Sequence, residues 1–86
     1  MRKEGSGYVG LVPYPGRVYV YFRVGITRDV SWDIIKNLGV EPEITNPRGL
    51  GTAWRVVVPT GKELEFMAKF RSIIEVNDAT VEWIKK

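Results

Sequence analysis

Residues 54–83 read WRVVVPTGKELEFMAKFRSIIEVNDATVEW, and this stretch decides the fold. A run of β-branched residues ends at Pro59, an amphipathic segment follows, and an alternating segment completes the stretch. The residues Thr60–Glu63 match a capping box, in which the Thr hydroxyl and the Glu carboxylate each accept a hydrogen bond from an unpaired helical amide. The stretch therefore predicts a strand, a helix over Gly61–Ser72 and a final strand over Ala79–Ile84.

The first half of the chain repeats this plan. The alternating residues Arg17–Val24 predict a strand that buries one of its faces. Thr27 is a suitable N-cap for a helix over Arg28–Leu38, whose apolar residues recur at helical spacing. A weaker strand over Val40–Ile44 contains Pro42 and is therefore predicted at an edge of the sheet.

Strand–helix–strand written twice in so short a chain predicts an α+β fold, the ferredoxin-like split βαβ sandwich, with a four-stranded antiparallel sheet and two helices on one face. Residues 16–86 are expected to form this single domain. Residues 1–15 are expected to precede it as a flexible leader and a strap or extra edge strand. The predicted core consists of Val18, Val20, Phe22, Ile34, Leu38, Trp54, Val56, Val58, Met67, Phe70, Val76, Val81 and Trp83.

Composition argues against catalysis and against a bound metal. The chain contains no Cys and no His, so it lacks thiol nucleophiles, thiolate ligands and the commonest general base. Its serines have no evident activating base nearby in the sequence, and its carboxylates lack the spacing of a calcium-binding loop. We therefore expect a binding protein rather than an enzyme, with no cofactor and no metal.

Charge and hydropathy leave the kind of partner open. The 13 Lys and Arg residues exceed the 10 Asp and Glu residues, for a net charge of +3, which permits nucleic acid or an acidic protein without requiring either. No apolar run approaches the roughly 18 residues of a membrane span. The N-terminus lacks the apolar segment of a secretory signal. We expect no membrane contact and no export signal, and a cytoplasmic location if the sequence is full length.

Four strands with both helices on one face leave the other face of the sheet open. By strand alternation this open face carries aromatic, cationic and apolar side chains together, a mixture that is enriched at recognition sites. Because this mixture is richer than a solvated surface needs, we expect the face to bind a partner. The candidate residues on it are Tyr19, Tyr21, Arg23, Arg55, Val57, Thr80 and Glu82.

The ordered set of motifs resembles the propeptide domains of subtilisin-like serine proteases. Pro15–Thr27, read as PGRVYVYFRVGIT, resembles the opening of those domains. Asp33–Gly39 is similar to their first helix with its Leu-Gly end, and Val56–Glu63 to the junction of a strand with the second helix. Phe70–Ile73 and Val76–Glu82 resemble the end of that helix and the fourth strand.

This resemblance implies a fold, a function and a partner. Members of the family fold as antiparallel ferredoxin-like domains, and they act as folding assistants and inhibitors of the protease that they accompany. The resemblance implies that the open sheet face packs on the surface of a subtilisin-like protease. It also implies that the C-terminal residues Ile84, Lys85 and Lys86 enter the substrate cleft.

Two other hypotheses stay open. A ferredoxin-like sheet can bind single-stranded nucleic acid by stacking bases on aromatic residues and by contacting phosphates with basic ones. The residues that would do so here are Tyr19, Tyr21, Arg23 and Arg55. A module that pairs through its sheets or edges into a homodimer is the third hypothesis, and the sequence leaves monomer or homodimer undetermined.

Overall fold

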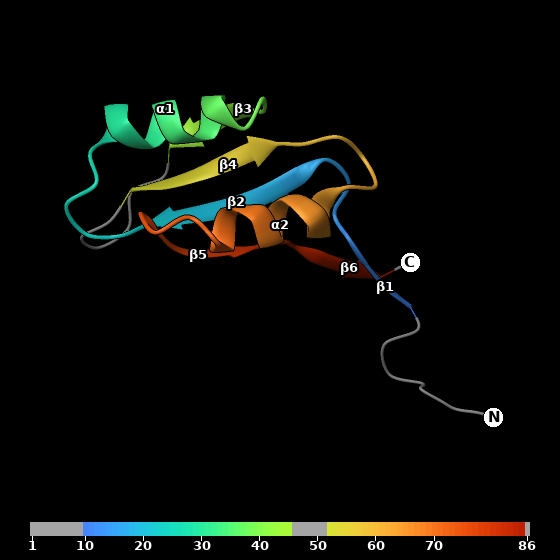
Figure 1. Cartoon of the computed structure of the whole chain (residues 1–86). Helices are drawn as coiled ribbons and strands as arrows, with labels where there is room; N and C mark the ends of the chain where they lie inside the picture. Colours follow the sequence, from blue (N-terminus) through green and yellow to red (C-terminus); the bar gives the residue numbers. More distant parts are fainter. Residues whose placement is uncertain (1–9, 46–51, 86) are drawn as a thin grey trace.

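The computed structural model describes residues 10–45 and 52–85 of the chain (Figure 1). The part of the chain that it describes contains two helices and two antiparallel sheets, which confirms the predicted α+β class. In chain order the elements are β1 (Leu11–Pro13), β2 (Arg17–Phe22), α1 (Arg28–Asn37), β3 (Glu41–Thr45), β4 (Ala53–Val57), α2 (Glu63–Arg71), β5 (Val76–Thr80) and β6 (Trp83–Lys85).

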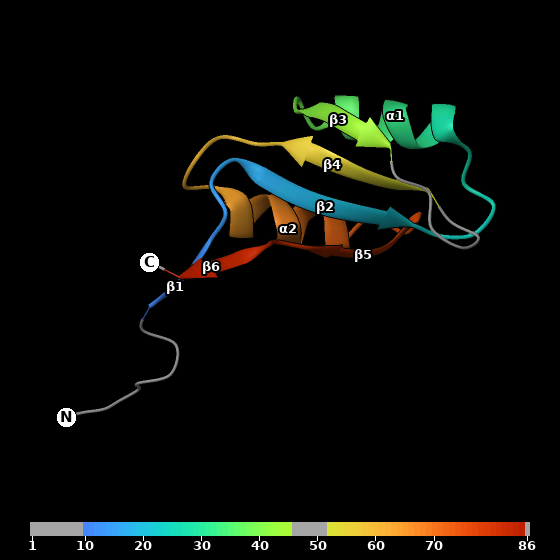
Figure 2. The same cartoon turned by 180° about the vertical axis from the view of Figure 1, so that it is seen from behind.

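The larger sheet has the strand order β3-β4-β2-β5, with every neighbouring pair antiparallel. Strand β2 therefore lies between β4 and β5, and the Pro42-containing β3 lies at an edge as predicted. Both helices cover the same face of this sheet, and Figure 2 shows the opposite face without a helix over it. Residues 1–9 of the predicted leader and strap lie outside the described residues, as do residues 46–51.

The core forms between the helices and the inner face of the larger sheet. Val18, Val20 and Phe70 are fully buried, whereas Tyr21 on the other parity of β2 is 38% exposed. This difference confirms the predicted strand register, because a slip of one residue would exchange the two faces. Most of the predicted core is buried, but Ile34, Leu38 and Met67 are only partly buried and pack against it.

Helix α1 begins where the sequence predicts, but its buried stripe is centred one residue later. The hydroxyl oxygen of Thr27 accepts a hydrogen bond from the Val30 amide, which confirms the N-cap. Ile35, rather than Ile34, is the fully buried residue. The neighbouring Ser31 is also fully buried, and its hydroxyl accepts a hydrogen bond of 2.7 Å from the indole nitrogen of Trp54. This bond gives the buried indole a partner and fixes α1 against β4.

The predicted final strand is two separate strands in the structure, and one residue predicted for the core is exposed. Strand β5 ends at Thr80, and β6 pairs instead with β1 in a separate two-stranded sheet. Trp83, predicted in the core, is consequently 51% exposed, because the chain has left the larger sheet before it. Within the predicted leader and strap, Leu11–Pro13 form β1, which pairs with β6 rather than with an edge of the larger sheet.

The predicted capping box at the start of α2 is wrong in part. Lys62 is the N-cap, and its side chain makes no capping hydrogen bond. The Lys62 amide instead bonds to the carbonyl of Pro59, which closes a turn in which Gly61 has a positive φ of 95°. This turn separates Thr60 from the helix, so the helix starts at Glu63 rather than at Gly61.

The buried face of α2 follows from this later start. Glu63, Phe66 and Phe70 lie on one stripe at helical spacing and are all buried. Leu64 lies off this stripe and is 45% exposed, whereas Phe66, which the predicted core did not include, is buried. The aromatic ring of Phe66 therefore supplies the apolar contact between this part of α2 and the core.

The carboxylate of Glu63 links the start of α2 to the start of β2. It is 5% exposed and accepts hydrogen bonds from the amides of Gly16, at 2.7 Å, and Gly61, at 3.0 Å. Burial acts to raise the pKa of this carboxyl, but the hydrogen bonds from the Gly16 amide, from its own amide and from the Gly61 amide outweigh burial and lower the pKa below its ordinary value. The ionised side chain therefore stabilises the folded state.

We expect Glu63→Gln to lower the free energy of unfolding at pH 7 by about 1–2 kcal/mol, because the buried Gly16 amide and the more exposed Gly61 amide lose a charged acceptor. Since the folded-state pKa lies below the unfolded value of about 4.3, this contribution is complete above that pH and is lost as the pH falls through the folded-state pKa. Urea unfolding of both proteins between pH 7 and pH 3 measures the effect. The two stability curves should converge in acid, and curves that stay parallel would contradict this account.

Candidate functional site

The open face of the larger sheet brings together most of the residues that the sequence predicts for binding. Tyr19 on β2 pairs with Arg55 on β4 and with Thr80 on β5, so these three side chains form a row across the sheet. Val57 lies one step along β4, opposite Arg17. The open face consists of Arg17, Tyr19, Tyr21, Glu41, Glu43, Ala53, Arg55, Val57, Asp78 and Thr80.

An ion-pair network orders the charged part of the open face. One carboxylate oxygen of Glu43 lies 2.8 Å from Nε of Arg55 and 3.2 Å from Nε of Arg17. Desolvation acts to lower the pKa of Arg55, but the hydrogen bond and charge of Glu43, joined by Tyr19, raise that pKa above its ordinary value. Arg55 is therefore a fixed positive charge held in place between two strands.

The side chain of Tyr19 is held by a hydrogen bond against a residue that follows the end of β5. Its hydroxyl donates a hydrogen bond of 3.2 Å to a carboxylate oxygen of Glu82, which lies between β5 and β6. The ring is thereby held in one orientation across β2 and β5. A fixed aromatic ring loses little conformational freedom when a partner covers it, which favours its use in binding.

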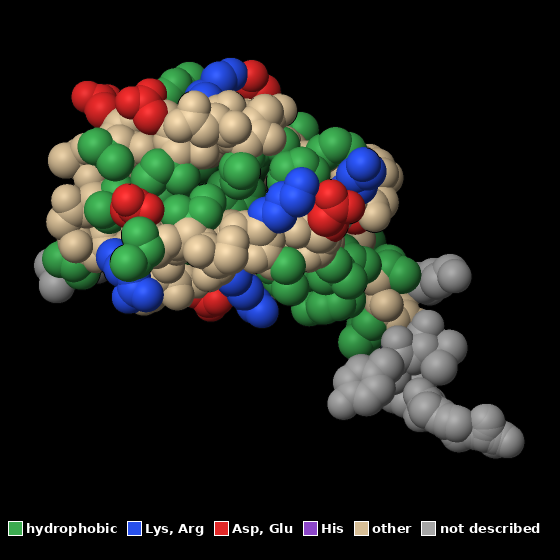
Figure 3. Space-filling model, viewed as in Figure 1, with side chains coloured by type: hydrophobic (Ala, Val, Ile, Leu, Met, Phe, Trp, Pro, Cys, Tyr) green, Lys and Arg blue, Asp and Glu red, His purple; other side chains and the backbone are tan. Residues whose placement is uncertain are grey.

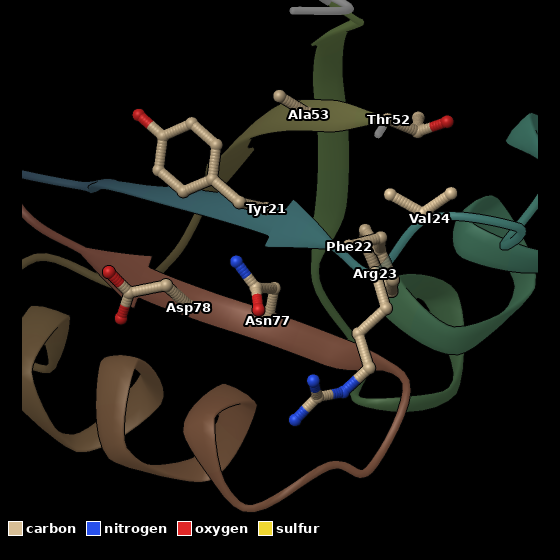
Figure 4. A pocket seen from close by; sticks show the side chains of 8 residues that line it. All are labelled: Tyr21, Phe22, Arg23, Val24, Thr52, Ala53, Asn77 and Asp78. Atoms are coloured by element: carbon tan, nitrogen blue, oxygen red, sulfur yellow. The ribbon is translucent and has the colours of Figure 1, made fainter. Parts of the chain in front are cut away.

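The remaining predicted residues lie apart from this row. Arg23 follows the end of β2, and its Nε donates a hydrogen bond of 2.7 Å to the carbonyl of Ile74, so its guanidinium turns toward the segment before β5 (Figure 4). Ile84 and Lys85 belong to β6, where they pair with Val12 and Leu11 of β1. Lys86 lies outside the described residues.

Sequence reasoning did not single out Arg17, Glu43 and Asp78. Arg17 has the same strand parity as Tyr19, so alternation alone could have found it. Glu43 was obscured because the pairing of β3 with β4 shifts register between Pro42 and Ile44. No local pattern marks that shift, so the meeting of Glu43 with two arginines becomes visible only in the folded chain.

Both edges of the larger sheet resist the addition of another strand. On β5, the Ala79 amide donates to the Asp78 carboxylate at 2.8 Å, and the Ala79 carbonyl accepts from Nε of Arg71 at 2.8 Å. On β3, Pro42 lacks an amide hydrogen. Side chains and proline at edges are features that prevent pairing between chains. A partner of the larger sheet is therefore expected to cover a face rather than extend an edge.

The side of the domain that carries the helices presents both hydrophobic and charged side chains at its surface. Figure 3 shows hydrophobic side chains gathered between the two helices, with charged side chains over the helices themselves. Among the exposed apolar residues there, Trp32 packs on Trp54 with ring centroids 5.7 Å apart, and the Lys36 ammonium lies 5.8 Å from the Trp32 ring. These contacts give Trp32 a structural role at the rim of the core.

A pocket of about 600 Å³ lies at the end of the open face where β2 ends (Figure 4). Tyr21 and Ala53 project on the same side of the sheet, and Asn77 and Asp78 approach them from β5. The pocket is lined by Tyr21, Phe22, Arg23, Val24, Thr52, Ala53, Asn77 and Asp78.

No protein-family model, no curated protein and no solved structure matches the chain, so comparison with known proteins assigns no function to the open face. Residues 10–45 and 52–85 hold no group of three or more His, Cys, Asp or Glu side chains that could bind a metal ion. In the same residues, neither helix has the length and apolar composition needed to span a membrane.

We expect Glu43→Gln to loosen the open face without unfolding the domain. The three partners are each about one-third exposed, and ion pairs of such exposure contribute at most about 1 kcal/mol. Urea unfolding should therefore show a loss below about 1 kcal/mol, while NMR relaxation at Nε of Arg17 and Arg55 should show increased motion. Glu65→Gln is the matched control, because Glu65 pairs only with Lys69 on the opposite side of the domain in the described structure. Unchanged relaxation in Glu43→Gln would contradict the network.

Proposed function

We propose that this chain is a non-catalytic protein-binding domain that contacts its partner through the open face. The observation that carries the proposal is the row Tyr19, Arg55 and Thr80, which crosses β4, β2 and β5. Glu43 holds Arg55 in this row, and Glu82 holds Tyr19. Aromatic and Arg side chains at the centre of a surface are the groups that most often dominate protein–protein binding. The closed edges of the sheet support the same choice, because they leave the face as its accessible surface.

We also propose that the larger sheet and its helices form a ferredoxin-like split βαβ sandwich. The order β3-β4-β2-β5, with α1 joining β2 to β3 and α2 joining β4 to β5, supports this assignment. The propeptide domains of subtilisin-like proteases, which the sequence resembles, have the same architecture. The partner that we propose is therefore a subtilisin-like serine protease, which the domain would inhibit or help to fold through its open face and its C-terminal end at Ile84–Lys86.

Charge on the open face favours a protein over a nucleic acid. Arg17 and Arg55 share the carboxylate of Glu43, and the Tyr19 hydroxyl is bonded to Glu82. Phosphates would have to compete with these carboxylates for the arginines, and the acidic groups would repel them. A partner with its own mixed charges and apolar groups fits this surface better. Single-stranded nucleic acid is thus the alternative that the binding experiment must separate.

The test compares a substitution on the open face with one on the helical side. Val57→Lys places a charge on the open face at the end of β4, next to the row of Tyr19, Arg55 and Thr80. A partner that covers the face would have to desolvate this charge, so binding should weaken by tenfold or more, or about 1.4 kcal/mol. Leu64→Lys makes a similar change at an exposed position of α2 and should leave binding unchanged. Binding and inhibition are measured for a panel of subtilisin-like proteases with micromolar domain, after thermal unfolding has verified that both variants fold.

Each result bears on a different part of the proposal. Absence of both binding and inhibition across the panel would remove these proteases as partners. Equal loss in Val57→Lys and Leu64→Lys would reject the open face as the binding surface. Tight binding to single-stranded RNA with a steep dependence on salt would replace the proposal with the nucleic-acid alternative.

A further inference from the structure

A β-bulge places two neighbouring polar side chains at one end of the open face. Tyr21 pairs with Asp78 and Phe22 pairs with Val76, so Asn77 is an extra residue in β5. Asn77 and Asp78 are both exposed, between the buried Val76 and Ala79. Bulges redirect side chains in this way and are frequent beside functional sites.

The bulge faces a hollow above β2 and β4. Ala53 lies directly across from Tyr21, and its small side chain leaves the space beside the Tyr21 ring open. Ala53 is itself only 7% exposed and forms the floor of the pocket. In Figure 4 the Asn77 amide points from β5 toward β2, and the Asp78 carboxylate extends away from Asn77 on the side of the Tyr21 ring. The pocket volume of about 600 Å³ is ample for one long side chain.

The polar groups of the pocket are arranged for a cation rather than an anion. Both described contacts of the Asp78 carboxylate, with the Ala79 amide and with Nε of Arg71, use its Oδ1 atom. Oδ2 is the atom that would bind an incoming donor. Arg23, the only Lys or Arg among the lining residues, bonds through Nε to the Ile74 carbonyl and turns away from the Tyr21 ring.

We propose that this pocket binds a single arginine side chain of a protein partner, with the guanidinium stacked on the Tyr21 ring and bonded to the Asp78 carboxylate. A planar guanidinium can stack on an aromatic ring and donate two hydrogen bonds in its own plane, which a lysine ammonium cannot do. This proposal rests on the proposed function, since it names a side chain that the partner presents to the open face.

The test uses a small probe and needs no partner protein. Nα-acetyl-L-arginine amide is titrated into the whole chain, and amide NMR spectra report where it binds. The shifts should be saturable and centred on Tyr21, Asn77 and Asp78. Asp78→Asn keeps the acceptor for the Ala79 amide but removes the charge, and should weaken the probe about three- to fivefold. Glu65→Gln removes the same charge from α2, outside the pocket, and should not change the affinity.

A second variant tests the shape of the pocket. Ala53→Val adds two methyl groups to its floor while retaining a residue that favours strands, and it should abolish the saturable shifts. The unligated spectrum of each variant shows whether the fold is intact. Preserved probe binding in a folded Ala53→Val would overturn the assignment of the pocket.

Three further results would overturn the proposal. They are the absence of saturable shifts with the arginine probe, equal shifts with Nα-acetyl-norleucine amide, and the same shifts with inorganic phosphate. Failure of the arginine site can be distinguished from failure of the proposed function. If the probe binds but Val57→Lys does not weaken partner binding, only the open-face function fails. If Val57→Lys weakens partner binding but the probe does not bind, only the arginine site is rejected.

Discussion

The buried carboxylate of Glu63 connects the two halves of the fold. It accepts hydrogen bonds from Gly16, at the entrance to β2, and from Gly61, in the turn before α2. The Gly16 carbonyl in turn accepts a hydrogen bond of 3.0 Å from the Val58 amide, which continues the pairing of β2 with β4. A single side chain thus sets where the central strand begins relative to its neighbour and to the helix that covers it.

The position of β2 determines which side chains face the helices and which face outward. With Gly16 held at this point, Val18 and Val20 enter the core, and Tyr19 and Tyr21 reach the open face. A buried charge would destabilise the fold if it lacked partners, but the amide hydrogen bonds compensate for its desolvation. The open face therefore owes its composition to an interaction on the opposite side of the sheet.

Local patterns predicted the elements of the fold well. The strict alternation of β2 determined its register, because only one of its faces is apolar enough for a core. The N-cap at Thr27 and the edge position of β3 likewise follow from single residues with strong conformational preferences. The errors arose where a distant partner decides the conformation. Trp83 continues the apolar alternation of β5, yet its segment pairs with β1 from the other end of the chain.

The candidate site was predictable to the same extent. Tyr19, Arg55 and Thr80 meet because alternation and strand order together place them in one row. The bulge at Asn77 and the register shift beside Glu43 depend on how two strands twist against each other, which no short sequence pattern records. The pocket beside Tyr21 could therefore not have been found without the structure, although every residue that lines it lies on or beside a predicted strand.

The pairing of β1 with β6 determines when the small sheet can form during folding. Leu11 lies opposite Lys85, and the entropy lost in closing a loop grows with its length, so this pairing is unfavourable in an unfolded chain. Once β2 has paired with β5, only the short connections on either side of them remain to be closed. The small sheet is thus assembled on a completed larger one, and it can open while the core of the domain stays folded.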